Sequence, residues 1–240
     1  MIDIHSHVLP GIDDGSRSIE ESLRMIREAA KSGFTGIVCT SHYYSDAYSC
    51  DKSQRQILIN ELKKELRKQK IDVEIYNGAE VYISMDLDTL IEKDIIPTLN
   101  NSKYILFELP MNTKVIYMDE AINKMQKAGL ILILAHPERY SYMQKNFSAY
   151  EELIKKGIMF QVNLGSIVGR HGNMAKKIAK KLLKNNMVSV LSTDAHRPES
   201  MYQRTDEILK KLNKIIDKEK IELLTKVNPE HIIKNEEIVP

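Results

Sequence analysis

Seven short apolar segments alternate with helical segments along the chain, and this alternation limits the folds that the sequence can adopt. The segments lie at residues 1–5, 36–40, 73–77, 104–108, 130–135, 158–163 and 188–193. Strands that alternate with helices form parallel βα units. The fifth segment, LILILA, is apolar throughout, as expected for a strand that is buried on both faces. We therefore predict an α/β fold of parallel strands in a single domain over residues 1–240.

Helical signals fill the stretches between the strands. Ser18 with Glu21 three residues later is a capping-box pattern. We expect a charged helix over residues 53–70 that exposes its lysines and glutamates. Its predicted buried stripe consists of Ile57, Leu58, Leu62 and Leu66. The lysine-rich segment 174–184 has the apolar spacing of a packed helix, so we interpret its lysines as a solvated face and not as a nucleic-acid site.

Six of the seven strands end, within a residue or two, on a side chain that can bind a metal. Taken singly, each could be a solvated histidine or a salt-bridged carboxylate. In a βα barrel, however, the carboxyl ends of all strands share one face, where the active site lies. With Asp14 from the first loop, the imidazoles and carboxylates are too many for one ion and suit two or three divalent cations. The strand-end residues are His5, His7, His42, Glu80, Glu108, His136, Asp194 and His196.

The strand over residues 158–163 is the exception, because it ends on Asn163 without an obvious ligand. His171 and His231 lie away from any strand end, and we expect both at the surface.

The composition excludes several classes of function. The chain has 35 Lys and Arg against 33 Asp and Glu, a formal charge of +2, which gives no general attraction to nucleic acid or to an anionic membrane. No apolar run approaches the roughly 20 residues that span a bilayer, so we expect no membrane insertion. Cys39 and Cys50 lack CxxC spacing, and no signal peptide precedes the first strand. We expect a cytoplasmic protein with free thiols.

The motifs IDIHSHVLPGIDDG, TSHY, GAE, FELP, AHPERY and STDAH resemble, in order and spacing, those of the PHP (polymerase and histidinol phosphatase) superfamily. They are most similar to its manganese-dependent protein tyrosine phosphatases from bacterial capsular and exopolysaccharide gene clusters. The resemblance covers nearly the whole chain. It implies a distorted TIM-like (β/α)7 barrel that holds three metal ions at the carboxyl ends of its strands, with Mn²⁺ expected and Fe or Zn as alternatives.

The resemblance also implies which residues hold each ion. His5, His7, Glu80 and Asp194 correspond to the ligands of a first ion. Glu80 bridges to a second ion, which Glu108 and His136 complete. The third ion is held by Asp14, His42 and His196.

Three arginines are candidates for contact with phosphate. Arg139 matches the family arginine that binds phosphate, and its guanidinium suits bidentate contact. The family often has another arginine several residues after the DxH motif. Here Arg197 follows His196 directly and Arg204 lies eight residues on, so the sequence leaves open which of these two contacts the substrate.

The resemblance implies hydrolysis of a phosphotyrosine on the tail of a partner bacterial tyrosine kinase that regulates polysaccharide synthesis. Two close divalent ions activate water and contact both the attacking and the leaving oxygen. No cysteine precedes an arginine with C-x5-R spacing, so a cysteinyl-phosphate route has no support. The alternatives are a histidinol phosphatase, a non-catalytic metal-stabilised binding module and a metal-dependent nuclease. Tyrosines that could stack on an aryl phosphate, or only pack, are Tyr43, Tyr44, Tyr48 and Tyr82.

Overall fold

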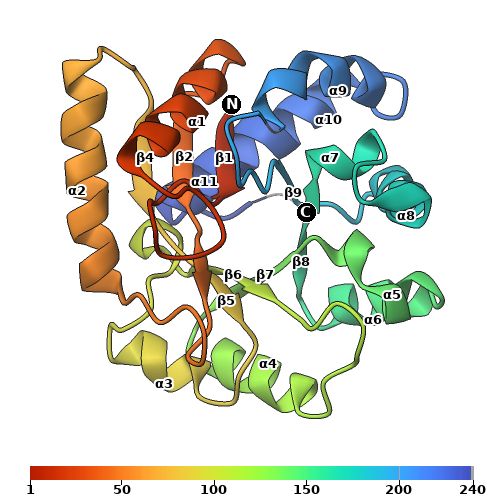
Figure 1. Cartoon of the computed structure of the whole chain (residues 1–240). Coiled ribbons are helices and arrows are strands. Elements are labelled where there is room, and N and C mark those ends of the chain that lie inside the picture. Colours follow the sequence, from red (N-terminus) through yellow and green to blue (C-terminus); the bar gives the residue numbers. More distant parts are fainter. Residues whose placement is uncertain (200, 239–240) are drawn as a thin grey trace.

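The structure is a computed structural model that describes residues 1–199 and 201–238. Its strands lie at the centre and its helices surround them (Figure 1). Each of the seven predicted segments contains a strand, and the second and third segments continue after a short break as β3 and β5. The strands are β1 (Ile2–Ser6), β2 (Gly36–Cys39), β3 (His42–Tyr43), β4 (Glu74–Asn77), β5 (Glu80–Tyr82), β6 (Tyr104–Glu108), β7 (Ile131–Ala135), β8 (Met159–Asn163) and β9 (Val190–Ser192).

Every pairing between these strands is parallel, as predicted. The strands form two sheets, in the orders β1-β2-β4 and β3-β5-β6-β7-β8-β9. The chain directly after β9 returns to β1, because the amide of Asp194 donates to the carbonyl of His5 (2.8 Å) and the amide of His7 donates to the carbonyl of Ala195 (2.9 Å). If β2 with β3 and β4 with β5 are each counted as one interrupted strand, seven strands follow one another around the centre. This matches the distorted TIM-like arrangement.

Helices connect the strands and cover their outer side. None of the helices within the described ranges has the length and apolar character that crossing a membrane requires. The helices are α1 (Ile19–Lys31), α2 (Lys52–Lys68), α3 (Leu87–Glu92), α4 (Met118–Lys127), α5 (Ser141–Gln144), α6 (Ser148–Lys155), α7 (Leu164–Ile167), α8 (Gly172–Lys184), α9 (Thr205–Leu212), α10 (Lys218–Glu222) and α11 (Asn228–Lys234), with short 3-10 turns at Leu99–Asn101, Pro137–Arg139 and Tyr202–Arg204 and a π-helical turn at Leu223–Val227.

The capping box predicted for α1 is half formed. The Ser18 side chain accepts a hydrogen bond from the amide of Glu21, while the Glu21 carboxylate accepts from the amide of Arg17 (2.8 Å) and not from that of Ser18. A complete box occurs instead at α2, where Asp51 and Gln54 satisfy each other's backbone amides. Helix α2 therefore begins at Lys52, one residue before the predicted start at residue 53.

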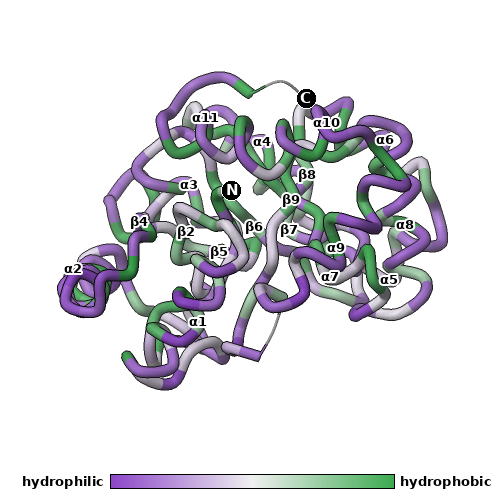
Figure 2. Tube along the Cα trace, turned by 90° about the horizontal axis from the view of Figure 1, so that it is seen from above, coloured by the Kyte–Doolittle hydropathy of each residue, from purple (hydrophilic) through white to green (hydrophobic). Residues whose placement is uncertain are grey.

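The buried apolar side chains of the described residues form two clusters. Residues of alternate position on the strands, such as Ile4, Leu106 and Ile133, pack with Ile232 and Ile233 of α11, and we call this set the inner apolar cluster. The intervening strand residues pack against the surrounding helices in a larger cluster. The view in Figure 2 shows the strands β6 to β9 largely hydrophobic and α2, at the edge, largely hydrophilic. Helix α11 therefore covers one end of the strand ring, which leaves the carboxyl ends of the strands for the site.

The buried stripe of helix α2 agrees with the prediction at Leu62 and Leu66, and Leu58 is partly buried against the core. Ile57 is 67% exposed, whereas Ile59, Leu62 and Leu66 are buried. Arg55 takes part in the buried face, with its side chain completely enclosed. The prediction was wrong at Ile57, and its stripe lacked Ile59 and Arg55, which are buried.

Arg55 supports the breaks that separate β2 from β3 and β4 from β5. Its Nη1 donates to the carbonyls of Ser41 (2.9 Å) and Gly78 (3.2 Å), and its Nη2 donates to the carbonyl of His42 (2.7 Å). Its Nε donates to the carbonyl of Cys50 (2.9 Å). A buried carbonyl without a partner is costly, so Arg55 stabilises the backbone of both strands at the point where they carry His42 and Glu80.

Candidate metal centre

The first strand delivers two imidazoles to one point. The register of β1 against β2 shifts between Asp3 and Ser6. Ile4 belongs to the inner apolar cluster, and the shift allows His5, the next residue, to face the same interior. His5 and His7 are completely buried, and their Nε2 atoms lie 3.2 Å apart. The predicted convergence of these two side chains is present.

Two carboxylates face these imidazoles. Glu80, in β5, places Oε2 at 3.1 Å from Nε2 of His5 and 3.4 Å from Nε2 of His7. Asp194, just after β9, places Oδ1 at 3.4 Å from each of the same two nitrogen atoms. These four side chains are the predicted ligands of the first ion.

A second group forms around Glu80 and Glu108. Nε2 of His136 lies 2.9 Å from Oε1 of Glu80 and 4.0 Å from Oε2 of Glu108. Nδ1 of His42 lies 3.1 Å from Oε2 of Glu80 and 3.0 Å from Oε1 of Glu108. Glu80 therefore faces histidines on both sides, as a bridging carboxylate requires.

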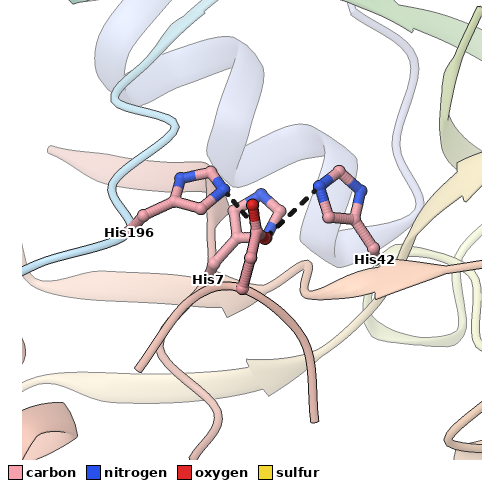
Figure 3. A group of neighbouring side chains, drawn as sticks. His7, His42 and His196 are labelled. Atoms are coloured by element: carbon pink, nitrogen blue, oxygen red, sulfur yellow. Dashed lines mark ion pairs between the residues drawn. The ribbon is translucent and has the colours of Figure 1, made fainter. Parts of the chain in front are cut away.

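A third group surrounds Asp14. Oδ1 of Asp14 lies 3.7 Å from Nε2 of His42 and 3.4 Å from Nε2 of His196, and Figure 3 shows the two imidazoles on either side of it. The ring of His7 stacks on that of His196, with centroids 3.8 Å apart. His42 contributes one ring nitrogen to this group and the other to the pair of glutamates.

All nine predicted metal ligands lie together, and we call these nine side chains the ligand cluster. In four overlapping groups, their donor atoms lie within 4.8 Å of one another; the groups are His7, Asp14, His42 and His196; His5, His7 and Glu80; His5, His136 and Asp194; and His42, Glu80 and Glu108. His5, His7, His42 and Glu80 each belong to two of these groups, and the sequence prediction anticipated a shared role only for Glu80.

The charges of the cluster suit cations. Burial raises the pKa of Glu80, but the imidazoles of His5 and His42 outweigh it and hold this pKa well below the ordinary value. Burial lowers the pKa of His5, but the carboxylates of Glu80 and Asp194 outweigh it and raise this pKa to about 9. The carboxylates thus attract positive charge to this point, which a proton on His5 or a divalent cation can supply.

Three polar atoms of the ligand cluster are buried without a hydrogen-bond partner among the described residues, namely Oε2 of Glu80, Nδ1 of His42 and Nδ1 of His136. Buried polar atoms of this kind usually have a partner. The first two of these atoms face other members of the cluster. Burial and the nearby Arg139 lower the pKa of His136, so its imidazole stays neutral, as a metal ligand must. The residues present therefore fit divalent metal ions.

A layer of polar side chains holds the ligands from behind. Oε1 of Gln161 lies 2.7 Å from Nδ1 of His5. Nε2 of Gln161 donates to Oδ1 of Asn163 (2.9 Å), whose Nδ2 donates to Oδ2 of Asp194 (2.8 Å). Such contacts fix the orientation and tautomer of metal-binding histidines. Strand β8, which ends without a ligand, thus supports the ligands of its neighbours.

Asp13 holds two further ligands in the same way. Its Oδ2 lies 2.8 Å from Nδ1 of His7 and accepts a hydrogen bond from the backbone amide of His42 (2.8 Å). Burial opposes its charge, but His7 outweighs this effect and lowers the pKa of Asp13 far below the ordinary value. The sequence prediction used Asp14 and missed Asp13, although the two carboxylates are neighbours.

His171 does not lie at the open surface as predicted. It is half-buried, and its Nδ1 lies 2.9 Å from Oγ of Ser166, which donates to Oε1 of Glu138 (2.6 Å). Glu138 is completely buried next to Arg139 in the chain and also accepts from the amide of Asn163 (3.0 Å). This chain of contacts anchors the turn that carries Arg139. The second histidine, His231, is half-exposed on α11.

Two ligands have unusual backbone geometry. His136 has a φ of 35° and Asp194 has a φ of 54°, a left-handed region that costs free energy in residues other than glycine. His136 follows β7 directly and Asp194 lies two residues after the end of β9, and in each case the turn directs the side chain to the cluster.

The three candidate arginines occupy different environments. Nη1 of Arg139 donates to Oδ2 of Asp194 (2.7 Å), and its side chain is 28% exposed. Nη1 of Arg197 donates to the carbonyls of Gly15 and His196. Arg204 is paired with Glu207 on the same helical turn (3.0 Å). The structure brings Arg139 and Arg197 to the ligand cluster and engages Arg204 elsewhere.

A comparison with protein families agrees with this geometry. The family model described as capsular polysaccharide synthesis, CpsB/CapC, matches residues 1–234. The chain belongs to the CpsB/CapC family. The resemblance to proteins of capsular gene clusters that the motifs indicated is thereby confirmed.

Relatives in the CpsB/CapC family match over most of their length. The tyrosine-protein phosphatase YwqE of Bacillus subtilis (strain 168) is 31% identical over 238 residues, which cover 99% of this chain and 93% of YwqE. The tyrosine-protein phosphatase CpsB of Streptococcus pneumoniae is 33% identical over 223 residues, which cover 88% of this chain and 90% of CpsB. A chain from the crystal structures of YwqE and CpsB, metal-dependent tyrosine phosphatases, matches with a TM-score of 0.94 at 30% identity and covers 100% of this chain and 96% of its own length.

Proposed function

We propose that this member of the CpsB/CapC family is a metal-dependent phosphatase that hydrolyses phosphotyrosine in proteins. The observation that carries the proposal is the ligand cluster. Its nine imidazole and carboxylate side chains form overlapping groups of donor atoms, and Arg139 lies beside them. The names of the relatives, tyrosine-protein phosphatases, support the substrate class.

We assign the three groups of ligands to two or three divalent ions, with Mn²⁺ expected and Fe or Zn acceptable to the same mixed donors. Bound divalent ions activate water and neutralise the charge of a phosphate ester. The protein holds the donors in place through Gln161, Asn163 and Asp13 and limits access of bulk water by burying His5, His7 and Glu80 completely.

Arg139 is the side chain that we assign to the phosphate. Its guanidinium has five N–H groups, and the contact of Nη1 with Asp194 leaves the others available to equatorial phosphate oxygens. A planar fork of this kind binds phosphate with two parallel hydrogen bonds. We assign a similar role to Arg197, whose guanidinium lies against the carbonyls of the first loop.

The proposed partner is the phosphotyrosine tail of a bacterial tyrosine kinase that regulates capsular or exopolysaccharide synthesis. We also propose that residues 1–240 form one PHP-type phosphatase domain. The name of the matching family, capsular polysaccharide synthesis, supports this partner. We propose a cytoplasmic location, supported by the free thiols of Cys39 and Cys50.

The test compares two substrates with Mn²⁺-loaded protein. We expect turnover of a phosphotyrosine peptide, with histidinol phosphate turned over more slowly by at least an order of magnitude. EDTA should abolish activity, Mn²⁺ should restore it, and circular dichroism should stay unchanged in both states. A clear preference for histidinol phosphate would contradict the proposed substrate, and full activity in EDTA would contradict the metal requirement.

Variants of the ligand cluster add a second arm to this test. His136→Ala and Asp194→Ala should abolish turnover while the circular dichroism spectrum is retained, because each removes a donor and leaves the strands in place. Protein that contains metal and hydrolyses no aryl phosphate would favour a binding module instead.

A further inference from the structure

Two tyrosines each lie two residues after a candidate metal ligand, which is the repeat of side-chain direction in a β-strand. Tyr44 lies two residues after His42, and Tyr82 lies two residues after Glu80. His42 and Glu80 are partners in the parallel register of β3 and β5. In an extended chain, residues i and i+2 point to the same side. The two tyrosines therefore continue the wall that the two ligands begin.

The intermediate residue obeys the same alternation. Tyr43, between His42 and Tyr44, is buried in the large apolar cluster. It points away from the site, so of the two roles that the sequence left open for Tyr43, stacking on a substrate or packing, the structure favours packing.

The rings of Tyr44 and Tyr82 form a continuous aromatic surface. Their centroids lie 4.8 Å apart with an interplanar angle of 38°, and Tyr44 is 38% exposed. Tyr82 is paired in register with Glu108 of β6, so this surface stands beside the ligand cluster. Burial raises the pKa of Tyr82, and the Glu108 carboxylate and the hydroxyls of Tyr44 and Tyr117 add to the effect. We call the two rings the tyrosine pair.

The tyrosine of the neighbouring loop has a different role. The ring of Tyr48 stacks on that of His42, with centroids 5.8 Å apart and an interplanar angle of 17°. Its backbone is joined to that of Tyr44 by two hydrogen bonds, of 2.9 and 2.7 Å. Tyr48 thus covers a ligand, and the turn that it closes holds Tyr44 in position.

We infer that the tyrosine pair is an aromatic subsite that receives the phenyl ring of an aryl phosphate monoester whose phosphate lies at the ligand cluster. The inference rests on the proposed function and adds the groups that select the ester. Two residues of strand advance by about 6.6 Å. A phenyl ring joined to a phosphate through one ester oxygen therefore reaches the layer of the pair, whereas the short alkyl chain of phosphoserine brings no ring to it.

The chemistry of the two rings favours this occupant. Aromatic side chains interact with another ring in tilted or offset arrangements. The two rings are tilted by 38°, Tyr44 is exposed and Tyr82 is half-buried, so part of the aromatic surface is open to solvent. Core packing explains Tyr43, but it does not explain the exposure of Tyr44, which lies two residues after His42.

The experiment measures binding with two phosphonates that cannot be hydrolysed. Isothermal titration of Mn²⁺-loaded protein gives the ratio of the dissociation constants of methylphosphonate and phenylphosphonate, which is the preference for the ring. The variants are Tyr44→Leu and Tyr82→Leu, with Tyr44→Phe and Tyr82→Phe to retain the ring. Tyr76→Leu is the matched control, because Tyr76 is a half-buried tyrosine of β4 that packs on the inner apolar cluster away from the site.

We expect each leucine variant to reduce the preference about threefold to tenfold, the range for an aromatic pair, with methylphosphonate binding unchanged. The phenylalanine variants and Tyr76→Leu should retain the wild-type ratio. A wild-type ratio in the leucine variants, or equal loss of both phosphonates, would overturn the inference. Because Tyr44 is exposed, Tyr44→Leu remains informative even if Tyr82→Leu fails to fold.

Turnover separates this result from the fate of the proposed function. If wild-type protein hydrolyses a phosphotyrosine peptide but the leucine variants retain the preference for phenylphosphonate, the subsite alone is refuted. Wild-type protein that hydrolyses no phosphate monoester and binds neither phosphonate refutes the proposed function and the subsite with it.

Discussion

Arg139 and Asp194 are joined by a hydrogen bond of 2.7 Å between Nη1 and Oδ2. The other oxygen of the same carboxylate, Oδ1, lies 3.4 Å from Nε2 of His5 and of His7. One carboxylate therefore orients the guanidinium assigned to the phosphate and also belongs to the ligand cluster. A change at either residue affects both the phosphate contact and the orientation of the ligands.

Arg139→Ala should reduce kcat/KM for a phosphotyrosine peptide by about tenfold to 150-fold, which corresponds to the ~1.5–3 kcal/mol of a charge-assisted hydrogen bond. Arg139→Lys should recover little of it, because an ammonium group lacks the planar fork. Steady-state kinetics with measured Mn²⁺ content separates the phosphate contact from loss of metal. Unchanged kinetics in Arg139→Ala would contradict the role.

Arg197 and Arg204 should differ in their effects. Arg197→Ala removes the donor to the carbonyls of Gly15 and His196, so we expect KM to rise by about an order of magnitude, the range of a single charge-assisted contact. Arg204→Ala breaks only the ion pair with Glu207, an exposed pair of small energetic value, and should leave kcat/KM within about twofold. The reverse order of effects would assign the phosphate contact to Arg204.

Gln161→Leu should weaken Mn²⁺ binding or activity by about tenfold to 100-fold, because it removes the acceptor that orients His5. Gln161→Glu keeps an acceptor at this position and should lose less. Titration with Mn²⁺ of metal-free protein measures the effect. Gln126→Leu is the control, since the Gln126 side chain lies in α4 and donates to the carbonyl of Lys156. An equal loss there would show a general effect of the substitution.

His171 should make metal-free protein sensitive to acid. Burial, followed by the charge of Arg139, lowers the pKa of His171 from 6.5 to about 4. Between these values the unfolded chain binds a proton that the folded chain does not, so the free energy of unfolding decreases as the pH falls from 6.5 to 4. His171→Gln removes this titration.

Urea unfolding in EDTA at pH 7, 5.5 and 4 checks this expectation. The His171→Gln variant should lose less stability than the wild type across the window. The same substitution at the half-exposed His231 is the control. Parallel stability curves for the wild type and His171→Gln would contradict the prediction.

Alkylation should distinguish this phosphatase from a cysteine-dependent one. Burial raises the pKa of Cys39 to about 12 and also raises the pKa of Cys50, and only the thiolate reacts readily. Iodoacetamide at pH 7.5 should leave Cys39 unmodified in native protein, as mass spectrometry of peptides can show, and activity should persist. Rapid inactivation that follows modification of Cys39 would refute this.

The convergence of eight of the nine side chains in the ligand cluster could be predicted, because these eight lie at strand ends and depend on strand order, whereas Asp14 lies in the loop after β1. Once the strands are parallel and adjacent, their carboxyl ends meet at one face. The side chains of His5, Glu80, His136 and Asp194 then converge whatever the details of the helices. Some backbone features at these positions depart from regular strand geometry, such as the register shift in β1 and the left-handed φ of Asp194. These departures are local, and no sequence pattern predicts them.

The supporting residues could not be predicted in the same way. Gln161 and Asn163 are polar residues of an ordinary strand, and their function depends on β8 lying between β7 and β9. Asp13 resembles its neighbour Asp14 in every property that a sequence shows. Arg55 lies in a helix full of charged residues, and burial of one guanidinium among them depends on carbonyls that become adjacent only in the fold.

Arg55 has a consequence for how the protein acquires its ions. The guanidinium of Arg55 binds the carbonyls of Ser41, His42 and Gly78. Because Arg55 is part of the chain, the interrupted strands that carry His42 and Glu80 reach their positions during folding and not on arrival of an ion. Metal uptake can then be limited by diffusion and dehydration of the ion. Apoprotein should serve as a ready receptor in a cell where metal supply fluctuates.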